Sequence, residues 1–113
     1  MKKILLTSAV AMLALSNGTQ AADVSGLYGD WCLIGMSAEE NGELIPDNAN
    51  YQFTKDGMLN YSMGFFKQSG KYEIDGEKIK TKEMGNYKII SVGSEKMVLY
   101  YGGYMQFIKG KCK

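Results

Sequence analysis

The chain has 113 residues, of which 45% are hydrophobic, and it carries 13 lysines, no arginine, 12 acidic residues and no histidine, for a formal net charge of +1. Nucleic-acid recognition relies on an excess of basic groups and on bidentate Arg forks, so this balance excludes a nucleic-acid partner. The lack of His removes Ser-His and Cys-His nucleophilic pairs and the commonest metal ligand. We therefore expect no metal, no cofactor and no enzymatic activity.

The first residues have the pattern of a targeting segment. A basic pair at 2–3 precedes an apolar run over 4–15, and Thr19-Gln20-Ala21 fits the small-x-small rule for signal cleavage. The run is too short to span a bilayer. We interpret residues 1–21 as a secretory signal peptide cut after Ala21 or Ala22, because the alternative of a buried N-terminal helix would require a polar second face. The protein is then periplasmic or secreted.

The rest of the chain, residues 22–113, is long enough for one domain with a modest core. Its only cysteines are Cys32 and Cys112. In an oxidising compartment a disulfide is favoured over two free buried thiols. Closing a loop of about 80 residues would stabilise the fold by about 4 kcal/mol in the chain-entropy model. Loss of the two lysines of the leader would bring the net charge to about −1.

The first strand is predicted over residues 27–34, where Gly29 and Trp31 share one face. A glycine two residues before the only Trp lets another segment lie directly against the strand beside the indole. We expect structural roles for both residues, with the indole closing one end of the fold.

The strand pattern disappears over residues 35–50. Ser37-Ala38-Glu39-Glu40 is a capping box, so we expect one helical turn inside a long first loop. Met36, Leu44 and Ile45 are its large apolar residues. They either cover an opening as a lid or simply anchor the loop.

Short alternating segments separated by Gly-containing turns then follow each other at a spacing of about ten residues. Together with the first strand they predict an all-β fold, a single small antiparallel up-and-down eight-stranded barrel that is monomeric, whose first and last strands lie side by side and are joined by the disulfide. The further strands are expected at 51–54, 58–63, 70–74, 77–83, 87–92, 95–101 and 104–109.

A row of alternating lysines at 78, 80 and 82 marks an outward face and so fixes the inward side of each strand. Glu83 is the one carboxylate that shares the inward face of its strand, which is too little for an acid–base pair. Several converging Tyr hydroxyls suit a ligand that is part apolar and part polar, whereas the alternative is that the rings simply fill a short barrel. The candidate ligand-binding residues are Tyr51, Phe53, Tyr61, Met63, Tyr72, Tyr87, Met97, Leu99 and Tyr101.

The Gly29-x-Trp31 pair, the long first loop, hairpins such as residues 70–76 and the apolar strand 96–100 resemble the lipocalin-like, or calycin, barrels, above all the small bacterial ones. The resemblance spans the whole chain after the leader and implies a barrel that binds a small amphipathic or hydrophobic ligand. The Arg that covers the Trp in that family is missing, so the resemblance assigns its role to Lys109 or Lys111.

Residues 103–110 are similar, more loosely, to the C-terminal strand of the small periplasmic lysozyme inhibitors, which are also disulfide-stapled barrels. This resemblance implies the alternative function, a protein-binding module such as a periplasmic enzyme inhibitor or an immunity-type protein acting through the hairpin 100–104. A void in the barrel favours a small ligand. A solid barrel with clustered surface aromatics favours a protein partner.

Overall fold

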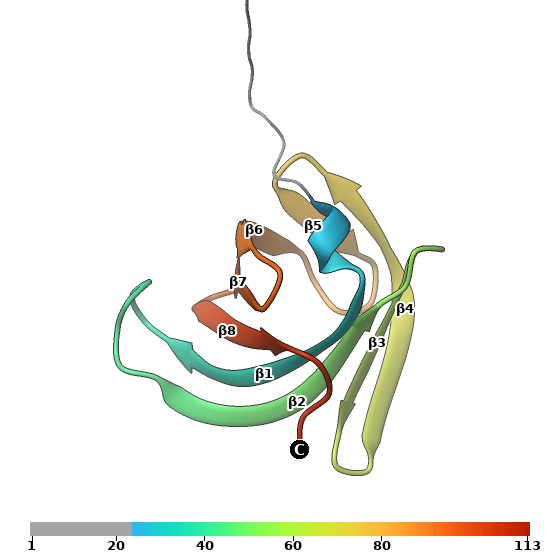
Figure 1. The fold of residues 1–113 in the computed structure, drawn as a ribbon. Coiled ribbons are helices and arrows are strands. Elements are labelled where there is room, and N and C mark those ends of the chain that lie inside the picture. Colours follow the sequence, from blue (N-terminus) through green and yellow to red (C-terminus); the bar gives the residue numbers. More distant parts are fainter. Residues whose placement is uncertain (1–23) are drawn as a thin grey trace, which may run out of the picture.

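A computed structural model describes residues 24–113, which form one closed barrel of antiparallel strands in the order β1 to β8 (Figure 1). The expected all-β, up-and-down, eight-stranded architecture is confirmed. The signal peptide expected at residues 1–21 lies outside the described residues. The elements are η1 (Val24–Leu27), β1 (Gly29–Ser37), β2 (Ile45–Phe53), β3 (Met58–Met63), β4 (Phe66–Asp75), β5 (Lys78–Thr81), β6 (Tyr87–Val92), β7 (Lys96–Tyr100) and β8 (Tyr104–Lys109).

Strand β1 closes the barrel because it pairs with β2 on one side and with β8 on the other. Trp31 lies opposite Tyr51 of β2 and opposite Lys109 of β8. The register shifts between Leu33 and Gly35 in both pairings, which marks a β-bulge that bends the strand and adds twist. The bend lets one strand serve both neighbours around a small barrel.

The prediction of a long first loop with a helical turn is wrong in both the length and the conformation of the loop. Strand β1 continues through Ser37 and β2 begins at Ile45, so the connection covers residues 38–44 only and contains a turn in which the Gly42 N–H donates to the Glu39 carbonyl at 2.9 Å. The ladder explains the difference: Met36 lies opposite Ile45 on one side and Met105 on the other, and this tertiary pairing overrides a local capping signal.

The inward side chains fill the barrel with one hydrophobic cluster. Most of the residues predicted to face inward are buried, as strand alternation requires. Met63 and Tyr101 are exceptions, with 44% and 52% of their surfaces exposed. Met63 is the last residue of β3, and Tyr101 directly follows the last residue of β7. The alternation there extends past the buried part of the barrel. The most deeply buried large side chains are Leu27, Trp31, Phe53, Leu59, Ile79, Met97, Leu99 and Phe107.

One end of the barrel is closed by η1 and Trp31. The indole is fully buried, and its Nε1–H donates to the Leu27 carbonyl at 2.9 Å. Lys109 stands over the indole with Nζ 4.5 Å from the ring centroid, in cation–π geometry, and donates to the Tyr28 carbonyl at 2.6 Å. Of the two lysines that the resemblance offered, Lys109 takes the position. We call this the closed end.

Gly29 makes room for this arrangement. A Cβ at this position would lie 3.1 Å from Lys109 Nζ, and the backbone has φ 112°, which other residues rarely adopt. The glycine therefore allows the ammonium group to settle between the backbone and the indole, as the spacing of Gly29 and Trp31 predicts.

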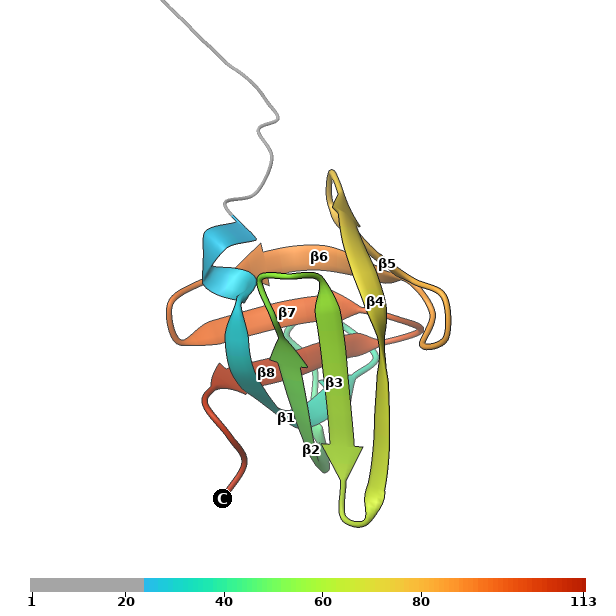
Figure 2. The ribbon, with the colours of Figure 1, turned by 90° about the vertical axis from the view of Figure 1, so that its right-hand side faces the viewer.

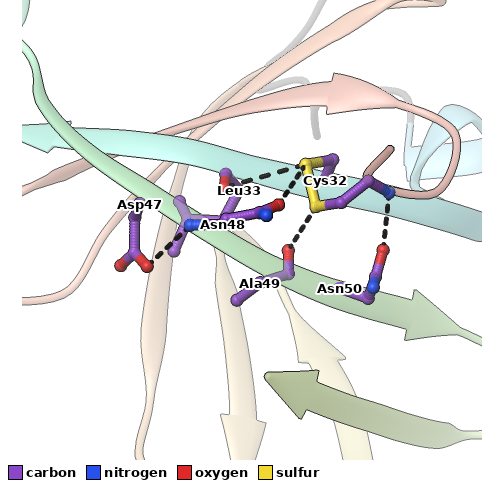
Figure 3. The surroundings of a disulfide bond; sticks show 7 residues. Cys32, Leu33, Asp47, Asn48, Ala49 and Asn50 are labelled. Atoms are coloured by element: carbon purple, nitrogen blue, oxygen red, sulfur yellow. Dashed lines mark hydrogen bonds between the residues drawn. A yellow bond between two sulfur atoms is a disulfide. The ribbon is translucent and has the colours of Figure 1, made fainter. Parts of the chain in front are cut away.

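The expected disulfide joins Cys32 of β1 to Cys112, with Cα atoms 4.9 Å apart, and no free cysteine occurs in the described chain (Figure 3). Cys112 is held independently, because its N–H donates to Asn50 Oδ1 at 2.7 Å. Its sulfur also lies 3.3 Å from the Ala49 carbonyl, a contact without a donated proton because an oxidised sulfur carries none. The bond fastens the C-terminal segment across the outer face of β1 and β2.

Candidate functional site

The end of the barrel opposite η1 is open, and its rim is formed by every second connection: β1–β2, β3–β4, β5–β6 and β7–β8. In Figure 2 the β3–β4 hairpin projects at the bottom, whereas η1 lies at the top beside the β2–β3 turn. A hollow of about 380 Å³ lies at the open end. We call it the open mouth; its lining residues are Tyr51, Tyr61, Phe66, Gln68, Glu83, Met84, Gly85, Tyr87 and Tyr101.

Aromatic rings in edge contact form two walls of the mouth. On the β2–β4 side, the centroids of Tyr51 and Tyr61 are 5.0 Å apart and those of Tyr61 and Phe66 are 5.9 Å apart. On the β6–β8 side, Tyr87 and Tyr101 are 5.3 Å apart. Such offset contacts fix ring orientation better than aliphatic packing does. The rings therefore offer a preorganised aromatic surface.

One hydroxyl group of the mouth begins a short relay of hydrogen bonds. The Tyr87 hydroxyl donates to the Met84 carbonyl at 3.3 Å. The relay is anchored because the Met84 N–H donates to Thr81 Oγ1 at 2.9 Å. The proton of Tyr87 is thereby committed inside the protein.

Burial raises the pKa of Tyr51 and of Tyr87. Tyr87 and Tyr61 add to the rise at Tyr51, and Tyr101 adds to the rise at Tyr87 whereas Tyr51 opposes it. Burial and then the charge of Asp47 raise the pKa of Tyr61. Each shift has the direction that desolvation of a phenolate requires. The mouth is thus lined by neutral phenols at physiological pH, which donate and accept hydrogen bonds without acting as bases.

Tyr101 and Gly85 meet at the rim. A Cβ on Gly85 would lie 2.8 Å from the Tyr101 ring, and the backbone there has φ 88°. The glycine lets the ring lie against the β5–β6 connection while half of its surface stays in solvent. Tyr101 therefore lies at the edge of the mouth, whereas we predicted that it would face the interior of the barrel.

The nine candidate ligand-binding residues separate into three groups. Tyr51, Tyr61, Tyr87 and Tyr101 line the mouth. Phe53, Tyr72, Met97 and Leu99 belong to the buried cluster. Tyr72 lies in the closed half, where its hydroxyl donates to the Thr54 carbonyl at 2.6 Å. Met63 is exposed on the β3–β4 hairpin and does not line the mouth.

Five lining residues were missing from the prediction. Phe66 and Gln68 were missed because we expected the strand to start at residue 70, whereas β4 starts at Phe66. Extending the alternation backward from Tyr72 would have found both. Glu83 was predicted to face inward, but we considered it only for an acid–base pair and not as a ligand-binding residue. Met84 and Gly85 lie in the β5–β6 connection, where alternation gives no signal. Leu44 and Ile45, the proposed lid, border a separate hollow.

A second hollow, of about 340 Å³, lies on the outer face of β1–β4 beside the disulfide. Three of its polar side chains are linked to one another: Asn60 Nδ2 donates to Gln52 Oε1 at 2.9 Å, and Ser69 Oγ donates to Asn60 Oδ1 at 2.7 Å. The described residues contain no group of three or more His, Cys, Asp or Glu placed to hold a metal ion. The open mouth is therefore the stronger candidate.

A search of solved structures places this architecture among known folds. The chain is similar to the crystal structure of a lipocalin-like protein from Bacteroides uniformis ATCC 8492, with a TM-score of 0.61 and 18% identity over 76% of this chain and 100% of that one. This is a lipocalin-like β-barrel. No family model and no curated protein matches the sequence.

Among the described residues, no helix is long and apolar enough to cross a membrane. The disulfide indicates an oxidising compartment.

Proposed function

We propose that the protein is an exported, non-enzymatic binding module that takes the head of a small amphipathic ligand into the open mouth. The observation that carries the proposal is the convergence of four tyrosines from β2, β3, β6 and the β7–β8 turn on one hollow. Rings with polar tips suit a ligand that is part apolar and part polar. The basic and apolar leader of the sequence supports export.

The depth of the mouth limits the size of the ligand. Phe107 lies beneath the tyrosines, with its centroid 5.1 Å from that of Tyr51, and is buried to 1% exposure. A long chain therefore has no path into the barrel. The remainder of the ligand would lie along the rim, where Phe66 and Tyr101 keep 59% and 52% of their surfaces exposed.

The test is titration of the purified full-length protein with octyl glucoside below its micelle concentration, followed by calorimetry. We expect Tyr101→Ala to weaken binding about fivefold, because one aromatic contact is worth about 1 kcal/mol. Tyr100→Ala is the matched control, since the Tyr100 ring packs against Tyr104 at 5.0 Å and does not line the mouth. Equal losses in the two variants, or no binding at all, would refute the proposal.

A protein partner is the second candidate. The filled barrel and the exposed aromatic side chains of the β3–β4 hairpin both favour it. Phe65 at the tip is fully exposed, and Met63 and Phe66 are exposed beside it. An apolar group held away from the barrel is a typical anchor for a partner pocket. Inhibition of a lysozyme by the purified protein, relieved by Phe65→Ser, would support this function, and no inhibition would exclude that class of partner.

A further inference from the structure

We propose that the open mouth selects ligands with a cationic ammonium head group, with the carboxylate of Glu83 as its counter-ion and the mouth tyrosines as its walls. The inference rests on the proposed function and specifies the class of ligand.

A glycine on the inward side of β4 makes room for the side chain of Glu83. Gly70 is buried and lies opposite Leu59, so it occupies an inward position of β4. A Cβ at Gly70 would lie 2.6 Å from Glu83 Oε1 and 3.9 Å from Glu83 Cβ, so the whole side chain lies over the glycine. The carboxylate therefore occupies the space that any other residue at position 70 would take.

The carboxylate of Glu83 has no partner in the described part of the chain. Glu83 is exposed, and neither a hydrogen bond nor an ion pair engages its carboxylate there. It differs from other unpaired surface acids, such as Glu77, because it lies over a buried glycine and borders the hollow lined by the aromatic rings. A chain with 13 lysines has ample means to neutralise an acid. The open carboxylate is thus available to an external cation.

The lysines near this end face other surfaces. Lys67 borders the outer hollow beside Asp30, and Lys82 borders an outer hollow on β4 and β5. No lysine lines the mouth. The charge of Asp47 also reaches this end, since it acts on the hydroxyls of Tyr51 and Tyr61. Among residues 24–113, Glu83 is therefore the one charged side chain that lines the mouth.

The aromatic walls complete a cation site. An ammonium group is attracted to the face of a Tyr or Phe ring, and quaternary ammonium groups are recognised in cages of such rings. Tyr61, Phe66, Tyr87 and Tyr101 line the same hollow as Glu83. A carboxylate ligand would meet the opposite conditions: an unpaired negative charge, and a Tyr87 hydroxyl whose proton is already donated within the protein.

The experiment compares three probes with the same octyl tail: octyltrimethylammonium, octyl glucoside and octanoate. Each is titrated into the full-length protein by calorimetry below its micelle concentration. We expect the cation to bind about tenfold more tightly than octanoate, and its affinity to fall as salt is added.

Three variants assign the preference to Glu83. Glu83→Gln should weaken binding of the cation about fivefold and leave octyl glucoside unchanged. Gly70→Ala keeps the charge but moves the Glu83 carboxylate, because the new Cβ occupies its place. This variant should therefore weaken binding of the cation by a similar factor. Glu77→Gln, which removes an exposed charge from the β4–β5 turn at the closed end, is the matched control and should change nothing.

Two results would overturn the inference while the proposed function stands: octanoate binding as tightly as the cation, or Glu83→Gln weakening all three probes equally. Absence of binding by every probe would overturn both. Selective loss of the cation in both mouth variants, with the control unchanged, would establish Glu83 as the counter-ion.

Discussion

Replacing Trp31 tests whether the closed end is purely structural. The indole is fully buried and its N–H satisfies the Leu27 carbonyl at 2.9 Å. Trp31→Ala removes the ring, leaves a cavity and deprives that carbonyl of its donor, for a loss of about 4 to 6 kcal/mol. Small domains have a total stability of about 5 to 15 kcal/mol, so this variant will be close to unfolding.

Trp31→Phe keeps the test informative where the alanine variant does not fold. It retains a ring beneath Lys109 and removes the N–H donor, so we expect a loss of about 1 to 3 kcal/mol. Urea unfolding followed by circular dichroism measures both variants. Because the mouth lies at the other end of the barrel, Trp31→Phe should leave the affinity for octyl glucoside unchanged.

The same argument applies to fluorescence, since Trp31 is the only tryptophan in the chain. Its emission should be shifted to the blue, resist iodide quenching and change little when a probe binds. A red-shifted, readily quenched indole, or one that responds directly to the probe, would move the site to this end and refute the orientation argued here.

Three further outcomes follow from the structure. Replacing either disulfide cysteine by Ala should lower the free energy of unfolding by about 2 to 5 kcal/mol in urea, and thiol titration of unreduced, denatured wild-type protein should detect none. Folding raises the pKa values of Tyr51 and Tyr87, so above about pH 10 the unfolded state releases its phenol protons first. The free energy of unfolding therefore falls as pH rises above about 10 and is unaffected by these groups below that pH. Tyrosinate absorbance at alkaline pH measures this ionisation, and a free energy of unfolding that stays constant above about pH 10 would contradict the prediction. The double variant Leu44→Ser, Ile45→Ser should lower stability by less than about 1 kcal/mol and leave affinity for octyl glucoside unchanged, since these side chains are exposed and border a different hollow.

Local patterns in the sequence predicted the barrel because each is set by short-range physics. Alternation places one side of every strand in the core, Asp-Gly pairs form turns, and two cysteines in an oxidising compartment form a bond. The Gly29-x-Trp31 pair belongs to the same class, because the need for space beside a large ring is visible in two residues.

The extent of the first connection depended on tertiary pairing. Residues 35–37 and 45–50 have polar and turn-forming side chains that read locally as a loop, yet β8 and the bulge in β1 supply a ladder for them. Backbone hydrogen bonds from a strand far along the chain outweighed the capping signal at Ser37.

The composition of the site was determined only in part by the sequence. Alternation identified the four tyrosines of the mouth as inward-facing. It does not show how far along the barrel axis the buried core extends, so it could not distinguish the core residues Phe53, Met97 and Leu99 from residues that line the mouth. Alternation along the predicted strand places Glu83 on the inward face, and the hairpin register puts it beside Gly70, because the pairing of Tyr72 with Thr81 carried two residues further joins positions 70 and 83. Only the tertiary structure decided that the aromatic rings of β2, β3 and β6 border the same hollow as Glu83, because these strands meet at this end only once the barrel has closed.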